Sequence, residues 1–166
     1  MALLAAAGSA AQVLLGCSTT PSVNGTRDTQ RNSWSGRLAI QIQASSPSDA
    51  NEQSFSASFE LDGSPASGSL HLYTPLGSSA ARMTWSDSGA RLEQGGQTRD
   101  ATSLQALVRD TLGTDIPIAA MFAWLQGQPQ NVDGWTVDLK CYADGYVTAV
   151  RNSPLPHTRL LLILDR

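Results

Sequence analysis

Apolar and polar residues alternate along most of the chain from residue 34 onward, with the two-residue period of a strand that is buried on one face. In the segment 34–44, the apolar residues Leu38, Ile40 and Ile42 alternate with polar ones. The same alternation recurs in further segments: 54–61, 69–73, 80–85 and a short one around Leu92. Turn residues, not helical segments, separate these runs. The pattern therefore predicts an antiparallel meander with one wet face and one apolar face.

Between residues 100 and 127 the apolar spacing changes to that of amphipathic helices. The segment 100–113 predicts a first helix, with Asp100 or Thr102 as its cap and Gly113 as its end. A second helix begins near Pro117 and ends at Gly127. Its apolar face is formed by Ile118, Met121, Phe122 and Leu125, with Trp124 at the edge.

The strand pattern then returns in three segments: 135–141, 146–151 and 158–164. Cys141 alternates with apolar residues in the first of them and is expected to be a buried thiol. The whole predicts a mainly β fold, a curved antiparallel sheet of about eight strands interrupted by two helices. The apolar concave face of such a sheet must be covered. Periodicity leaves open whether the helices seal a core or leave a cavity for an apolar ligand.

The first sixteen residues carry no charge and are rich in Ala and Leu. They are too few to span a bilayer, which needs about 20 residues, and are typical of a signal peptide. The run Leu14-Leu15-Gly16-Cys17 resembles a bacterial lipobox, which would make Cys17 the lipid-modified, palmitate-bearing N-terminus. An ordinary signal peptide that happens to contain a cysteine is the alternative. By analogy with other lipoproteins, Ser18 implies export to the outer membrane.

A polar segment without periodicity follows, so residues 17–33 are expected to be a lipidated flexible tether, and 34–166 the folded domain. Net charge is −3 and Lys140 is the only lysine, which argues against nucleic acid as a partner. No nucleophile, metal or phosphate-loop motif occurs. His71 and His157 stand alone, on a polar strand face and in a proline-flanked loop. We therefore expect neither an enzyme nor a cofactor or metal site.

Several stretches resemble the LolB family of outer-membrane lipoproteins, the receptors that end the lipoprotein localisation pathway. They are WSGRLAI from residue 34, FSASF from residue 55, LYTPLGS from residue 72, LGTDIPIAAMFAWLQGQP from residue 112 and LPHTRLLLI from residue 155. The resemblance covers nearly all of the chain from Leu14. Phe59 stands where the family often has Trp, and the chain ends at Arg166 without the Trp common near the family's C-terminus.

The resemblance implies an unclosed antiparallel barrel with the helices as a lid over an apolar cavity that holds the acyl chains of a lipoprotein in transit. The residues expected to line this cavity are Leu38, Ile40, Phe59, Leu70, Leu72, Met83, Trp85, Leu104, Met121 and Trp124. The resemblance to the LolB family also places Leu76, between Pro75 and Gly77, in a loop that enters the membrane.

By the same resemblance, the protein is a monomeric lipid-binding chaperone at the periplasmic face of the outer membrane. It receives cargo from the periplasmic carrier LolA and transfers it to the inner leaflet. Three other interpretations compete with this one. They are a structural or assembly lipoprotein with a sealed core, a soluble LolA-like carrier, and a hydrolase whose Ser, His and Asp meet only in space. A lipobox favours the anchored receptor over the carrier, and an internal void would argue against the sealed core.

Overall fold

The computed structural model describes residues 32–43 and 53–166, in which one antiparallel sheet of nine strands packs on two helices. The strands are β1 (Ser33–Ile42), β2 (Gln53–Gly63), β3 (Gly68–Tyr73), β4 (Ser79–Ser86), β5 (Gly89–Gln94), β6 (Gln97–Ala101), β7 (Trp135–Asp138), β8 (Tyr146–Arg151) and β9 (Thr158–Leu164). The helices are α1 (Leu104–Leu112), α2 (Ile118–Leu125) and the short 3₁₀ turn η1 (Tyr142–Asp144).

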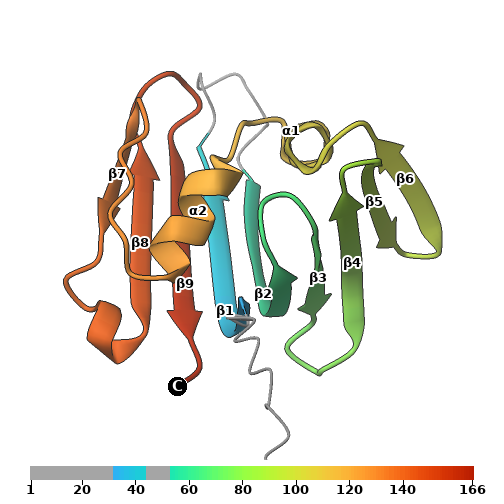
Figure 1. Ribbon diagram of the computed structural model, residues 1–166, viewed down its shortest axis with the longest axis horizontal. Helices are drawn as coiled ribbons and strands as arrows, with labels where there is room; N and C mark the ends of the chain where they lie inside the picture. The colour runs from blue at the N-terminus through green and yellow to red at the C-terminus, as the bar shows by residue number, and fades with distance from the viewer. Residues whose placement is uncertain (1–31, 44–52) are drawn as a thin grey trace, which may run out of the picture.

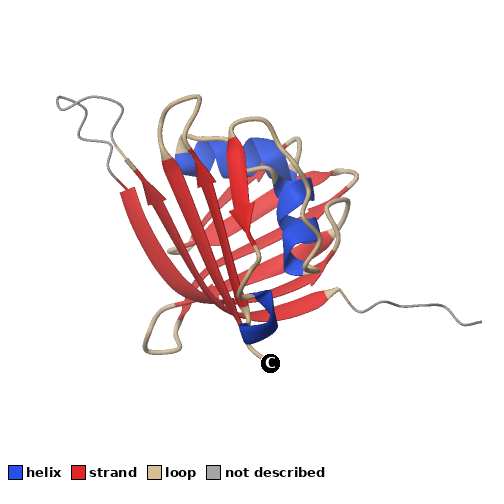
Figure 2. Cartoon of the chain, turned by 90° about the vertical axis from the view of Figure 1, so that its left-hand side faces the viewer, coloured by secondary structure: helices blue, strands red, loops and turns tan. Residues whose placement is uncertain are grey.

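The strand order is β6-β5-β4-β3-β2-β1-β9-β8-β7, so the sheet begins and ends on unpaired edges and does not close. Strands β1 to β5 form the meander that the alternation predicts, β6 extends it by one strand, and the C-terminal strands return to pair β9 with β1 (Figure 1). Figure 2 shows the sheet as one curved layer that bends around α1 and α2. This confirms a mainly β, unclosed antiparallel fold with two helices.

Cross-strand apolar pairs occupy the concave face. Leu38 lies opposite Leu162, Phe59 opposite Leu72, and Met83 opposite Leu92. Each of these side chains is at most 9% exposed, and each belongs to a single core cluster that includes both helices. Because side chains alternate between the two faces of a strand, the intervening polar residues point to the convex side.

The helices end where the sequence predicts but the first begins one residue later than expected. Ser103, not Asp100 or Thr102, caps α1, and its hydroxyl accepts a hydrogen bond from the Ala106 amide at 3.1 Å. Gly113 ends α1 in the left-handed region with φ 67°, where glycine is unstrained. Pro117 precedes the first residue of α2. No helix in residues 32–43 and 53–166 is long and apolar enough to cross a membrane.

Two further expectations were wrong. Residues 97–101 form strand β6 against β5, although only Ala101 among them is even partly buried. Strand β7 stops at Asp138, whose carboxylate accepts a hydrogen bond from the Lys140 amide at 2.9 Å and turns the chain into η1. Cys141 therefore leaves the strand and is exposed, not a buried thiol.

A buried arginine ties the helix connection to the sheet. The Arg151 side chain donates hydrogen bonds to the carbonyl oxygens of Asp115 (3.1 Å) and Pro156 (3.0 Å) and to the hydroxyls of Thr114 and Thr158. Arg151 is 5% exposed, and no carboxylate of the described residues forms an ion pair with it. Within the part of the chain that the structure describes, the Arg151 side chain thus serves as a hydrogen-bond donor to backbone carbonyl oxygens in the α1–α2 connection and in the loop after β8.

Candidate functional site: an apolar cavity under the helices

A cavity of about 640 Å³ lies between the concave face of the sheet and the two helices. That volume is within the range of roughly 300–1,000 Å³ typical of small-ligand sites. All but five of its lining residues are apolar. The apolar ones are Leu38, Ile40, Phe55, Phe59, Leu61, Leu70, Leu72, Ala81, Met83, Trp85, Leu92, Leu104, Val108, Leu112, Ile116, Ile118, Met121, Phe122, Leu125, Leu160 and Leu162.

Both helices present their apolar stripe to this cavity. From α1 the lining residues are Leu104, Val108 and Leu112, each four positions from the next, so they lie on one side of the helix. From α2 they are the four residues that the sequence places on its apolar face: Ile118, Met121, Phe122 and Leu125. Leu125 and Phe122 are nearly inaccessible, whereas Met121 and Leu112 are partly exposed.

Nine of the ten residues expected at the cavity do line it; Trp124 does not. Trp124 is completely buried on the other side of α2, where its ring lies 6.1 Å from that of Trp135 on β7. Its indole N–H donates to the Gln130 carbonyl oxygen at 3.0 Å. Three residues along a helix leave an angle of about 60° between Met121 and Trp124. That angle is enough to turn Trp124 toward β7 and away from the cavity.

Several lining residues were not expected, and the reason is clearest on β9. Leu160 and Leu162 face the cavity, but this strand is apolar on both faces, so its sequence does not show which side is concave. The register supplies the answer, because Leu162 pairs with Leu38 of β1. For α2, in contrast, the periodicity of the sequence already marks Ile118 and Phe122 as members of its inner face.

Five polar residues complete the lining: Gln53, Ser54, Gln94, Arg99 and Thr111. Gln53 is the first residue of β2 and Gln94 is the last residue of β5. Both therefore lie at the end of the sheet where β1, β3, β5 and β8 end. We call this the mouth end of the sheet. Within the described residues, its loops are 74–78, 95–96 and 152–157.

The loop 74–78 holds Leu76 outward at the mouth end. Gly77, with φ 80°, donates from its amide to the Thr74 carbonyl oxygen at 2.8 Å, and Thr74 donates to Ser78 at 2.8 Å. These bonds close a tight turn whose tip is Leu76, flanked by Pro75. The Leu76 side chain is 93% exposed, the highest value among the large apolar residues that the structure describes. A leucine in this position does not gain the favourable free energy that burial of its side chain would provide.

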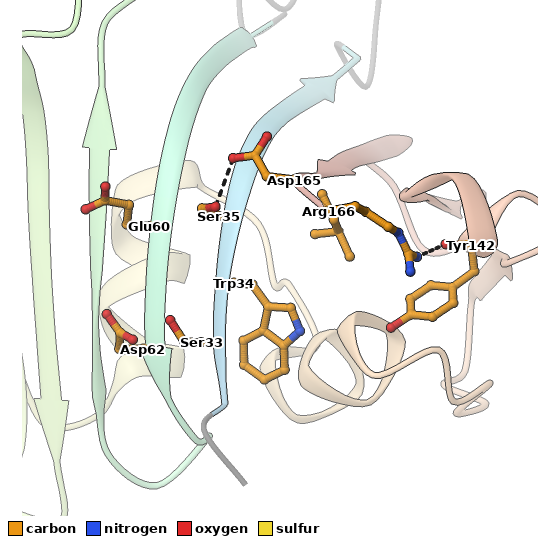
Figure 3. A pocket seen from close by; sticks show the side chains of 9 residues that line it. Ser33, Trp34, Ser35, Glu60, Asp62, Tyr142, Asp165 and Arg166 are labelled. Atoms are coloured by element: carbon orange, nitrogen blue, oxygen red, sulfur yellow. Dashed lines mark hydrogen bonds between the residues drawn. The ribbon is translucent and has the colours of Figure 1, made fainter.

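A second, smaller cleft of about 470 Å³ lies at the other end of β1 and has a different chemistry. Figure 3 shows its lining, with Glu60 and Asp62 on one side and Arg166 beside Tyr142 on the other. The Ser35 hydroxyl donates to the Asp165 carboxylate at 2.8 Å. Its walls are mainly polar and its carboxylates are exposed, so it cannot bury an apolar ligand.

The groups with shifted pKa values lie outside the cavity. A hydrogen bond from Tyr73 to the Glu60 carboxylate, 2.7 Å long, raises the pKa of Tyr73. The Arg91 guanidinium, 2.7 Å from Asp100, lowers the pKa of that carboxyl. Both pairs are exposed on the convex face. His71 is hydrogen bonded to Tyr73 and Arg82 on the same face.

The family model described as outer membrane lipoprotein LolB matches residues 30–155 of this chain, about three quarters of its length. The chain belongs to the LolB family. A LolB from Thiobacillus denitrificans is 28% identical over 165 residues, covering 86% of this chain and 84% of that protein.

Two shorter matches to LolB proteins agree with this assignment. One from Pseudomonas putida is 39% identical over 94 residues, which is 45% of this chain and 46% of that protein. One from Mannheimia succiniciproducens is 30% identical over 84 residues, which is 49% of this chain and 40% of that protein. In this LolB-family chain, Phe59 lies in the cavity wall at 3% exposure, so the smaller ring keeps the buried position. Cys17 lies outside the described residues.

Proposed function

We propose that this protein is a lipid-anchored receptor at the periplasmic face of the outer membrane, which accepts lipoproteins from the carrier LolA and inserts them into the inner leaflet. The observation that carries the proposal is an apolar cavity with a polar rim in a chain of the LolB family. A sealed-core structural lipoprotein would have no use for such a void.

The cavity chemistry suits acyl chains. Hydrocarbon needs no hydrogen-bond partner, and each CH₂ group moved out of water contributes about 0.8 kcal/mol. Because an acyl chain would pass at each step from one apolar environment to another, transfer would involve little change in hydrophobic free energy. Cargo can therefore move onward without nucleotide hydrolysis. The polar residues at the rim, among them Gln94 and Arg99, would contact the cargo's hydrophilic part.

Leu76 then serves delivery, not anchoring. Burial of one leucine contributes roughly 1.5–3 kcal/mol, far less than the acyl chains of a lipidated Cys17. Its loop is part of the mouth end, and neither Leu76 nor its neighbours in 74–78 carries a charge. The loop can thus enter the leaflet beside the cavity without desolvating an ion.

The tether is long enough for this orientation. Strand β1 begins at Ser33, at the end of the sheet opposite the mouth end, and its ten residues extend about 34 Å. The segment from Cys17 to Asn32 can reach roughly 50 Å when extended. An anchor at Cys17 therefore permits the mouth end to face the same membrane.

Leu76→Glu tests the proposal. The variant should fold normally and accept lipoprotein from LolA, but deliver it poorly to liposomes, because a carboxylate opposes entry into the leaflet. Acceptance and delivery are measured separately with purified components. Leu76→Met, which stays apolar, and Tyr146→Glu, which places the charge away from the mouth end, are the controls. Normal delivery by Leu76→Glu would refute the assigned role of the loop.

A further inference from the structure

Three large apolar side chains are exposed in the part of the chain that the structure describes: Leu76 (93%), Leu155 (53%) and Tyr146 (45%). Two of the three, Leu76 and Leu155, lie on loops of the mouth end. Tyr146 instead begins β8 at the opposite end of the sheet, where it pairs with Ile163 near the end of β9. The role proposed for Leu76 leaves Leu155 unexplained.

The loop 152–157 is fixed at its base and apolar at its tip. The Asn152 amide donates to the Gly134 carbonyl oxygen at 3.2 Å, and Gln43, just after β1, donates to the His157 carbonyl oxygen at 2.9 Å. The buried Arg151 side chain donates to the Pro156 carbonyl oxygen at 3.0 Å. The prolines on both sides of Leu155 have fixed φ angles and no amide donor. Leu155 is therefore held outward by a built loop.

The sheet order places this loop and the Leu76 loop apart along the mouth end. Leu76 lies between β3 and β4, Leu155 lies between β8 and β9, and strands β2 and β1 separate them. Figure 1 shows the loop between β3 and β4 at the bottom and the loop between β8 and β9 at the top, so the two loops lie on different sides of the mouth of the curved sheet. Neither loop contains Asp, Glu, Lys or Arg.

We propose that Leu155 is a second contact with the lipid leaflet, and that Leu155 and Leu76 together orient the cavity mouth toward the membrane. The inference rests on the proposed function, which brings this end of the protein to the bilayer. A single contact would leave the domain free to pivot, whereas two contacts on different sides of the mouth restrict the tilt.

A leaflet fits these loops better than the surface of a protein partner. Each tip offers one apolar side chain, too little for a hot spot of a protein interface, which is built from clustered anchors in matching pockets. Lipid needs no complementary pocket and accepts separate apolar tips. The absence of charge in both loops removes the main cost of entering the interface.

The test uses full-length lipidated protein in phosphatidylethanolamine–phosphatidylglycerol vesicles. In a Cys141→Ser background, Leu155→Cys, Leu76→Cys and Tyr146→Cys are each labelled with an environment-sensitive fluorophore and quenched with lipids that carry a quencher in the acyl chain. Labels at 155 and 76 should be shifted to the blue and quenched, and the label at 146 should behave as in water. Separately, Leu155→Glu should slow delivery to vesicles roughly tenfold, as expected for the loss of one buried leucine, while Leu155→Met should not.

The outcomes distinguish a failure of the second lipid contact at Leu155 from a failure of the proposed receptor function. A lipid-exposed label at 76 with a water-like label at 155 would overturn the second contact and leave the proposed function standing. Water-like labels at both positions would overturn the membrane orientation itself. A label at 155 that is shielded by LolA without vesicles, and not by vesicles, would replace lipid with the carrier as its partner.

Discussion

A carboxylate in the cavity wall should stop cargo uptake, and Met83→Glu is the sharpest way to place one. Met83 is 9% exposed, lies opposite Leu70 and Leu92 on the neighbouring strands, and lines the cavity. Thr84 is the next residue on β4 and points to the convex face, where it is exposed. Thr84→Glu therefore adds the same charge to the same strand outside the cavity. Met83→Gln introduces a polar side chain of the same size as glutamate but without its charge.

The cost to folding follows from the raised pKa of a buried carboxyl. Glutamate titrates near 4.3 in an unfolded chain, and burial raises the pKa by up to roughly 3–5 units. At pH 7 neutralising the group costs at most about 3–4 kcal/mol, and a buried neutral carboxyl without partners adds about 1–3 kcal/mol. Because water can enter through the mouth, we expect about 2–4 kcal/mol in total, less than the 5–15 kcal/mol of a typical domain.

The sign of the pH dependence is fixed by the same shift. Between the unfolded and folded pKa values, the folded Met83→Glu protein binds more protons than the unfolded chain, so its stability falls as pH rises. The stability gap between Met83→Glu and Met83→Gln should thus be widest near pH 8 and shrink toward pH 5. Urea denaturation followed by circular dichroism measures the gap at each pH.

Cargo acceptance is measured as the transfer of lipoprotein from LolA to each variant at pH 7.5. Circular dichroism first establishes that each variant is folded under these conditions. Met83→Glu should accept little cargo, Thr84→Glu should accept it normally, and Met83→Gln should lie between them. If folded Met83→Glu accepts cargo as well as Thr84→Glu does, the acyl chains do not bind in this cavity.

Three further predictions concern the anchor and stability. Cys17→Ala should release a folded protein from the membrane fraction, as judged by cell fractionation, and its retention there would reveal another anchor. Arg151→Met should lower the free energy of unfolding in urea by about 2–5 kcal/mol, because two partly buried backbone carbonyl oxygens and the hydroxyls of Thr114 and Thr158 lose their donor; an unchanged value would contradict that role. Asp100→Asn should lower the melting temperature slightly at pH 7 through loss of the Arg91 contact. Since the pKa of Asp100 is lowered, calorimetry should show the two melting temperatures converging below about pH 4, and a constant gap would contradict this.

The concave face of the meander could be predicted because each strand alternates cleanly. Alternation alone predicts that Leu38, Phe59 and Met83 face inward, and all three line the cavity. Strand β6 could not be found in this way, because an edge strand needs only hydrogen bonds to β5 and every residue of β6 but Ala101 is polar. Cys141 was misplaced because a local hydrogen bond at Asp138 ends β7 before the apolar alternation does.

Whether a cavity exists could not be read from periodicity, since the same residues would line a sealed core. Apolar patterning fixes which faces meet, whereas the space left between them depends on how strongly the sheet curves and how closely the helices approach. Those distances are tertiary: Trp34 and Tyr142 both donate hydrogen bonds to the Leu125 carbonyl oxygen, at 3.0 and 2.9 Å, and hold the C-terminal end of α2 against the sheet. The opposite end of the cavity is the mouth, where polar residues meet solvent. The void thus depends on contacts between residues far apart in sequence, which the alternation of apolar and polar residues along the chain does not report.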